Sequence, residues 1–397
     1  MNKRIFTLPF ILILIINTFN GLASYMVNPS LPDYLISKGA TMAMTGVISS
    51  LLSWVALIIR PVSGVASDRL DRKKLLLFSY AAVTASLFLY SIAPGVRSVV
   101  AIRIRHGIFF SLAGTAAMVF STQYIPRERL GEGLGYLSLS TLISTMIGPQ
   151  AGTIVADRLS MNMVFICAGV AELICTVMVL LLQYKQENRH QTVRKSIQIS
   201  ELFASELWVY VLLISLFSFG NGIVSYYLKK FGAARGIDNI TAYYTVNSLM
   251  LLLIKPLSGK LHDRKGIAFI LYPAYLITAA GMLIMANAHS LIMVIIVACL
   301  KAIGQGSGSP AIQAESVRML GNDRKGVAVS TCYIGMDIGN AVGPVFAGFT
   351  IERFGYQVMW TLYAVLLLSG VVMFHLYNHA GSNEKRMVIK KTESVSV

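Results

Sequence analysis

The sequence predicts an all-α membrane protein in which twelve transmembrane helices form two pseudo-symmetric six-helix bundles. Three observations lead to this fold class: the composition, the spacing of the apolar runs and an internal repeat. Of the 397 residues, 55% are hydrophobic and 13% are charged, whereas about 25% of a soluble domain is charged. This composition excludes a disordered chain and argues against a soluble enzyme.

Twelve apolar stretches each approach the roughly 20 residues that a membrane-spanning helix needs. The first imitates a signal peptide because Lys3 and Arg4 precede it, but no clear cleavage site of small residues follows, so we expect it to be retained. The expected spans are 5–27, 42–62, 75–93, 99–120, 133–155, 162–183, 207–228, 241–259, 267–286, 290–311, 327–350 and 357–378.

The most polar internal stretch separates the first six spans from the last six. The expected organisation is an N-terminal bundle (1–183), a cytoplasmic linker (184–206), a C-terminal bundle (207–380) and a disordered cytoplasmic tail (381–397). All four cysteines lie inside apolar runs and form no C-x-x-C pair, so neither a disulfide framework nor a metal site is expected.

The basic residues give the orientation of the chain. If the N-terminus is cytoplasmic, 22 Lys and Arg fall in cytoplasmic segments, 7 in outer loops and 5 within or at the ends of spans. This distribution obeys the positive-inside rule and predicts that both termini are cytoplasmic. The net charge of +16 is therefore mostly a signal for orientation. Nucleic-acid binding is not expected, because the basic residues lie in thin loops.

An internal repeat relates the two halves by an offset of 195 residues. An even number of spans in each half means that both halves enter the membrane in the same sense, as in a parallel repeat. The matching segments are Arg60-Pro61-Val62-Ser63-Gly64 with Lys255-Pro256-Leu257-Ser258-Gly259, Asp68-Arg69 with Asp263-Arg264, Gly148-Pro149 with Gly343-Pro344, and Asp157-Arg158 with Glu352-Arg353.

The loop between the second and third spans carries a family motif. The segment that contains Gly64, Asp68, Arg69 and Arg72 resembles the G-x-x-x-D-R-x-G-R-[RK] motif of the major facilitator superfamily of transporters. Asp71 departs from the pattern, because the family has Gly there and Asp adopts a positive φ less readily. The resemblance extends over the whole chain and implies the fold of that superfamily.

The resemblance implies a gating role for this loop. Asp68 would make a contact with a neighbouring helix that breaks and re-forms as the halves rock, and Asp263 with Arg264 would be a weaker copy. The alternative is a loop whose charges only set topology. We favour gating, because retention on the inner side explains Lys and Arg but not Asp.

Two further motifs lie within spans. Arg103, with His106 one turn deeper, belongs to a segment that resembles the family's R-x-x-x-G, which implies proton relay or gating. The alternative is an arginine that reaches to the outer interface. Gly148-Pro149-x-x-Gly152 resembles the G-P-x-x-G of the antiporter branch and so favours export, although small residues also serve simple packing.

Charges deep in spans are costly and suggest function. Asp337 and Lys301 both lie near mid-depth, so we expect an ion pair whose carboxylate can exchange its partner for a proton. The repeat relates Lys301 to His106 but Asp337 to Leu142, so the acid is specific to the second half. The alternative is a purely structural pair. For Glu172, the other deep acid, a structural and a functional role are left open.

Uncharged polar side chains complete the candidate site. The superfamily's arrangement implies that spans 1, 4, 7 and 10 line the cavity. Interhelical hydrogen bonding is the alternative role for each candidate. The candidates are Asn17, Asn20, Asn221, Asn247, Gln305, Tyr226 and Tyr243.

The predicted function is secondary active transport by alternating access. We expect proton-coupled efflux of a small amphiphilic drug or metabolite. Proton-driven import of a sugar, organic acid or peptide is the alternative, and a membrane receptor or enzyme would need a domain or catalytic constellation that we do not see. No cofactor is expected beyond the proton gradient. The expected partners are the substrate, protons and lipid, and the expected state is a monomer in the bacterial inner membrane.

Overall fold

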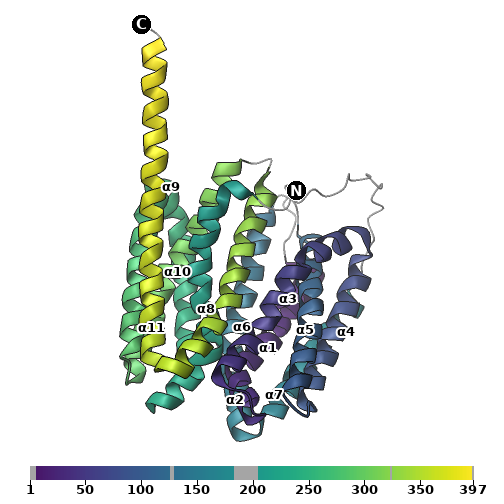
Figure 1. Ribbon diagram of the computed structural model, residues 1–397. Helices are drawn as coiled ribbons and strands as arrows, with labels where there is room; N and C mark the ends of the chain where they lie inside the picture. Colours follow the sequence, from purple (N-terminus) through teal and green to yellow (C-terminus); the bar gives the residue numbers. More distant parts are fainter. Residues whose placement is uncertain (1–5, 126–128, 183–203, 322–323, 396–397) are drawn as a thin grey trace.

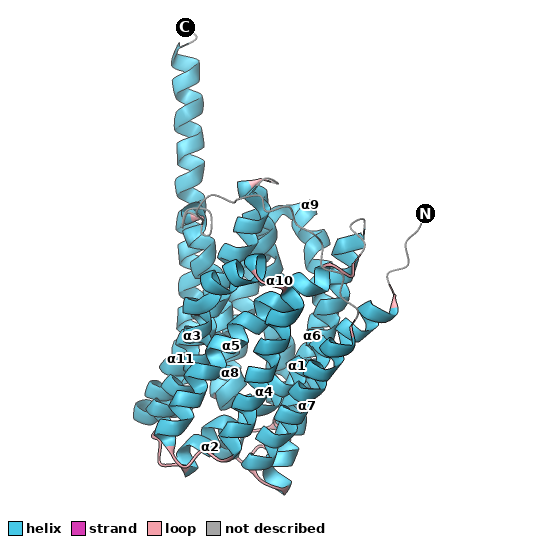
Figure 2. Cartoon of the chain, turned by 90° about the vertical axis from the view of Figure 1, so that its right-hand side faces the viewer, coloured by secondary structure: helices cyan, strands magenta, loops and turns pink. Residues whose placement is uncertain are grey.

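The computed structural model describes residues 6–125, 129–182, 204–321 and 324–395, and its regular elements within these ranges are all helical (Figures 1 and 2). The described chain begins and ends at the same end of the bundle, which we call the terminal end; the other is the opposite end (Figure 1). The first half contains α1 (Leu8–Val27), η1 (Asn28–Ser30), α2 (Leu31–Ser37), α3 (Met42–Arg69), α4 (Arg72–Ser91), α5 (Val96–Thr122), α6 (Leu130–Arg158) and α7 (Met161–Leu181). The second half contains η4 (Ser205–Leu207), α8 (Trp208–Arg235), α9 (Ala242–Ala286), α10 (Leu291–Leu320) and α11 (Lys325–Val395).

Two of these helices each hold two passes through the membrane. α9 bends at Gly266, with φ 76° and ψ 172°, and α11 bends at Gly355, with φ 81° and ψ 177°. Both positions need glycine, because a Cβ makes such a positive φ costly. With these bends counted, the described chain crosses the bundle twelve times, as the sequence predicts.

Within the described residues, nine helical stretches are apolar enough to be recognised as spans by composition alone. The stretch Val327–His379 holds two passes, while α6 and the first part of α9 are too polar to qualify. These two polar helices pack against each other, as the hydrogen bonds between Gln150 and Thr245 and between Thr145 and Ser248 show. Side chains that face a partner helix need not be as apolar as those that face lipid.

Several helices begin at side-chain caps. Thr41 Oγ1 accepts from Met44 N at 3.3 Å, and Asp71 Oδ1 accepts from Lys74 N at 2.9 Å. Asp71 has φ −60° and ψ 116°, which any residue can adopt. The departure from the family's glycine therefore costs nothing here, because the carboxylate caps α4 in place of a tight glycine turn.

The end of the first span and the C-terminal tail both differ from the prediction. The first span passes Asn28 without stopping and continues through η1 and α2 to Ser37, with Pro29 and Pro32 at the first turns of these elements, where a missing N–H costs little. The tail after Gly381, expected to be disordered, continues α11 as a helix to Val395 that projects beyond the bundle (Figure 1). Its stretch Glu384-Lys385-Arg386-Met387 and the pair Lys390-Lys391 are made of residues that favour helix. The expected linker lies almost wholly outside the described residues.

The hydrophobic core is divided unevenly between the two ends. One large cluster joins the second half to the opposite-end part of the first half, for example Leu31 and Tyr34 with Phe231. A separate, smaller cluster lies within the first half at the terminal end and includes Phe10, Leu76 and Phe120. The halves therefore share a continuous apolar core only toward the opposite end.

Candidate functional site

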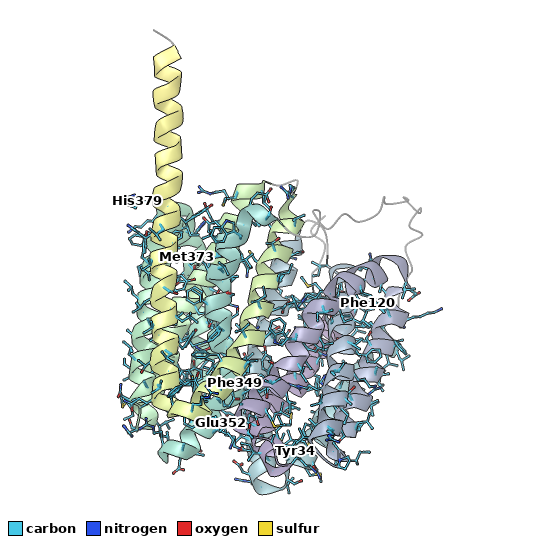
Figure 3. All side chains as sticks on the ribbon, in the orientation of Figure 1. Tyr34, Phe120, Phe349, Glu352, Met373 and His379 are labelled. Carbon is cyan, nitrogen blue, oxygen red and sulfur yellow. The ribbon has the colours of Figure 1, made fainter. Side chains whose placement is uncertain are left out.

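The seam between the halves is closed at the opposite end by charged contacts. Lys229 Nζ of α8 lies 2.7 Å from an Asp157 carboxylate oxygen at the end of α6, and Lys230 Nζ lies 2.7 Å from an oxygen of Asp33 on α2. Glu352 of α11 accepts from the backbone N–H of Ala43 at 2.6 Å, at the start of α3. Figure 3 shows Glu352 at this end of the bundle, where Tyr34 also lies. These contacts join three pairs of helices from different halves.

Arg103 extends this closure toward mid-depth. Its Nη2 donates to the Tyr226 hydroxyl of α8 at 2.8 Å and to the Ser49 carbonyl of α3 at 3.1 Å. The residue is 1% exposed. Because Arg103 is buried between helices, it does not extend to the outer membrane interface, and the prediction of an interfacial arginine is wrong. Tyr226 was predicted separately as a cavity residue, and the fold makes the two side chains partners across the seam.

His106 is buried within the first half. Its Nδ1 lies 3.4 Å from the Tyr90 hydroxyl of α4, and its ring packs edge-on against Phe110. The contact with Tyr90 stays inside one half. His106 and Arg103 therefore lie on one helix but have different surroundings.

The predicted ion pair between Asp337 and Lys301 is not formed. Asp337 instead binds Arg60 of α3, with Nε 2.5 Å from one carboxylate oxygen and Nη2 2.9 Å from the other. The correction follows from helix packing: α3 and α11 lie side by side across the seam, so the guanidinium of Arg60 reaches Asp337, with one hydrogen bond from Nη2 and a close charge contact from Nε. Among the described residues this is the ion pair between halves that lies nearest the terminal end.

Lys301 has neutral partners. Its Nζ donates to Asn221 Oδ1 of α8 and to Gln305 Oε1 of its own helix, each at 2.6 Å. The residue is 2% exposed. Lys301, Asn221 and Gln305 were predicted as separate site residues, and the structure joins them into one cluster in the second half. No described carboxylate lies within ion-pair distance of this ammonium group.

The remaining predicted amides tie helices together within one half. Asn20 Nδ2 of α1 donates to both carboxylate oxygens of Glu172 on α7, at 3.0 and 3.2 Å. Asn17 donates to the Leu137 carbonyl of α6 at 3.0 Å, and Asn247 donates to the Ala298 carbonyl of α10 at 3.0 Å. Tyr243 is buried in the second half. For Asn17 and Asn247 the described contacts are those of helix packing.

The loop motif is only partly described. The side chains of Gly64, Asp68, Arg69 and Asp263 lie outside the described set, so their predicted gating contacts stay predictions. Arg72 Nε donates to the Ser67 carbonyl at 3.4 Å, which ties the start of α4 to the end of α3. Arg264 is exposed beside the bend of α9 at Gly266.

The G-P-x-x-G segment of α6 lies against α1. A Cβ added at Gly148 would lie 2.8 Å from Cβ of Tyr25, and one added at Gly152 would overlap the Met26 carbonyl oxygen. Glycine at these two positions allows the backbones to approach closely. Pro149 lies inside the uninterrupted helix.

Sequence reasoning placed Arg60 at the edge of a span without giving it a role. The signal was present in the repeat, which aligns Arg60 with Lys255 at the same depth in the other half. The lysine and aspartate residues at the opposite end were also missed, because their charges come from loops and helix ends that meet only in the folded chain.

The fold and its polar seam define the class of the protein: a membrane transporter of twelve passes built from two related halves. The chain belongs to the Major Facilitator Superfamily, whose family model matches residues 13–297 and 270–394.

Relatives by sequence include two proteins named multidrug resistance protein MdtG. The protein from Citrobacter koseri is 26% identical over 375 residues, which is 89% of this chain and 90% of the relative. The one from Escherichia coli O17:K52:H18 is 25% identical over 389 residues, with coverage of 93% and 92%.

Solved structures of the same fold include transporters of different kinds. The nucleoside transporter NupG matches with a TM-score of 0.74 at 12% identity, covering 93% of this chain and 99% of NupG. A bacterial homologue of the human lysosomal transporter Spinster, in an inward-facing and unoccupied conformation, matches with a TM-score of 0.77 at 13% identity, with coverage of 95% and 97%. At this identity the likeness defines the fold alone.

Proposed function

We propose that this protein exports a small amphiphilic drug or metabolite in exchange for protons by alternating access. The positive-inside distribution assigns the terminal end to the cytoplasm. In that orientation the contacts at the opposite end close the seam toward the outside, which supports a protein that takes its substrate from the cytoplasm. The MdtG relatives, named for multidrug resistance, support export as the direction.

The ion pair between Arg60 and Asp337 is the observation that carries the proton-coupling proposal. Its side chains are 39% and 17% exposed, so the pair lies at the edge of the closed seam and protons can reach it. A proton on Asp337 removes the charge that holds the guanidinium and weakens the link between α3 and α11. Loss of that link allows the halves to change their relative tilt.

The contacts between the halves at the opposite end stabilise the conformation that is closed toward the outside. Lys229, Lys230 and Arg103 connect the halves at the opposite end, and these contacts must break when the protein opens outward. Proton binding at Asp337 and substrate binding then decide which set of contacts is made. We propose that the Gly148-Pro149-x-x-Gly152 packing keeps α1 and α6 moving as one body during this change.

Transport by purified protein in liposomes tests the function. A panel of fluorescent amphiphiles of each charge class is loaded and an inward-directed proton gradient is imposed. We expect gradient-driven efflux from wild-type protein, and loss of the gradient dependence in Asp337→Asn with substrate exchange retained. Asp238→Asn, which changes an exposed acid in a loop, is the matched control.

Two outcomes would contradict the proposal. Undiminished proton-driven efflux in Asp337→Asn would remove Asp337 from coupling. Uptake of substrate that follows protons inward would establish the import alternative.

A further inference from the structure

The two seams between the halves are related by the repeat, but in the part of the chain that the structure describes only one of them pairs its cation with a carboxylate. The offset of 195 residues relates Arg60 of α3 to Lys255 of α9, and Asp337 of α11 to Leu142 of α6. The first seam therefore contains a cation and its carboxylate, whereas the second contains a cation opposite an apolar side chain. This asymmetry leaves a positive charge whose role the fold does not explain.

Lys255 lies on the face of α9 that meets the first half. Seven residues, close to two full turns, separate it from Ser248, whose hydroxyl is 2.9 Å from Thr145 Oγ1 of α6. Ser248 is 5% exposed, and Lys255, nearer the terminal end, is exposed. The seam thus opens between these two residues, and the lysine stands at the opening.

The ammonium group of Lys255 has no partner among the described residues. No hydrogen bond or ion pair of the described side chains involves it, whereas Arg60 has two contacts with Asp337. The carbonyl of Leu142 accepts from Thr145 Oγ1 at 2.8 Å, which places Leu142 one turn closer to the terminal end than the seam contact. The position that would hold the counter-charge is therefore apolar.

A second unneutralised cation lies in the same half. Lys301 is held by the neutral groups of Asn221 and Gln305. Counted from the opposite end at 1.5 Å per residue, Lys255 of α9 and Lys301 of α10 lie at depths of about 20 and 15 Å. The second half therefore holds two lysines at similar depth for which the described residues supply no carboxylate, and low-dielectric surroundings strengthen the field of such charges.

From this geometry we propose that Lys255 binds the acidic group of the substrate: a carboxylate, sulfonate or phosphonate on an amphiphilic molecule that arrives from the terminal end. The inference rests on the proposed function for its direction, but the binding site itself does not depend on proton coupling. An anion supplies at Lys255 the charge that Asp337 supplies at Arg60. A lipid phosphate has the same chemistry, so the test must separate the two sources.

Equilibrium binding to the purified protein tests the proposal. The probes are 1-anilinonaphthalene-8-sulfonate and N-phenyl-1-naphthylamine, which share one ring system and differ in the sulfonate. The protein is held in nanodiscs of phosphatidylcholine, without a proton gradient. We expect Lys255→Gln to weaken binding of the sulfonate roughly tenfold, the size of one charged hydrogen bond, and to leave the neutral probe unchanged. Lys255→Arg should retain binding of the sulfonate.

A second variant tests the same idea through the partner position. Leu142→Asp places a carboxylate where the repeat places Asp337, and it should weaken binding of the sulfonate while Lys255 is intact. The double variant Leu142→Asp with Lys255→Gln should bind it no more tightly than Lys255→Gln. Equal melting temperatures of the variants and wild type establish that they are folded.

Each remaining outcome has a defined meaning. Equal weakening of both probes in Lys255→Gln overturns the proposal, because it assigns Lys255 to general packing. Unchanged binding of both probes overturns it as well. In nanodiscs that contain phosphatidylglycerol, Lys255→Gln could affect the two probes equally. That result would identify lipid phosphate as the occupant of Lys255 and overturn the substrate assignment. Charge-selective binding without proton-driven efflux would uphold Lys255 and refute only the coupling mechanism.

Discussion

The two halves of this transporter follow one helix order, yet equivalent seams between them are built differently. The seam of α3 and α11 holds the ion pair of Arg60 with Asp337, and the seam of α6 and α9 holds neutral contacts such as Thr145 with Ser248. Gly46 and Gly348 also bring α3 and α11 into close backbone approach, where the repeat has Thr241 and Thr153. A duplicated fold can thus keep its architecture while one seam pairs its cation with a carboxylate and the other, among the described residues, does not.

The largest effect on stability is expected from a comparison of a closely packed glycine, Gly152, with a glycine beside open space, Gly114. Gly152→Ala should destabilise the protein by about 2–3 kcal/mol, because its Cβ overlaps the backbone of α1 and a tight core cannot yield. Gly114→Ala is the matched control, since a Cβ there meets nothing within 4 Å and alanine favours helix by up to about 1 kcal/mol. Thermal unfolding in detergent measures both. Equal melting temperatures for the two variants would refute the role assigned to the G-P-x-x-G segment.

The charged seam should show coupling that the neutral seam lacks. A double-mutant cycle of Arg60→Gln and Asp337→Asn should give a coupling energy of about 1 kcal/mol, a modest value because Arg60 is 39% exposed and partly screened. The coupling should fall as salt is raised. Lys255→Gln, at the equivalent position without a counter-charge, should change the unfolding free energy by less than about 0.5 kcal/mol. A zero coupling energy at low salt would contradict the pairing.

The opposite end should respond to loss of one hydroxyl. Tyr226→Phe removes the acceptor that Arg103 reaches at 2.8 Å across the seam, and should weaken outer closure by about 1 kcal/mol. The measurement is labelling of a cysteine introduced at Ser49 by a maleimide that cannot cross the membrane, in a background without native cysteines. Faster labelling in Tyr226→Phe is expected. Tyr333→Phe, on an exposed tyrosine of α11, is the control.

The smallest effect is expected at the neutral seam. Thr145→Val removes one hydroxyl pair with Ser248 and should cost about 0.5–1 kcal/mol of stability. Because no charge is involved, this cost should not depend on salt, in contrast to the Arg60 cycle. A strong salt dependence would mean that the two seams do not differ in the way described. The free energy of unfolding of Thr145→Val and wild type, measured at two salt concentrations, tests this prediction.

Much of the fold follows from local sequence signals. Apolar runs of sufficient length define most spans, and the offset of 195 residues relates the halves. The polar helix α6 was also predicted, although composition alone does not identify it as a span. By contrast, the partner of Asp337 was predicted incorrectly, because depth along a helix says nothing about which neighbouring helix its side chain faces. The contact between Arg103 and Tyr226 was not predicted for the same reason.

The sequence by itself determined the number of passes, the relation between the halves and the identity of the deep charges, because hydrophobic length and periodicity are local properties of the chain. Only the tertiary structure decided which charges meet. Arg60 and Asp337 are 277 residues apart and come together because α3 and α11 share a seam. Lys255 and Lys301 have no carboxylate partner among the described residues for the same reason: the partners of a charge within the membrane come from other helices, and the fold decides which helices are neighbours.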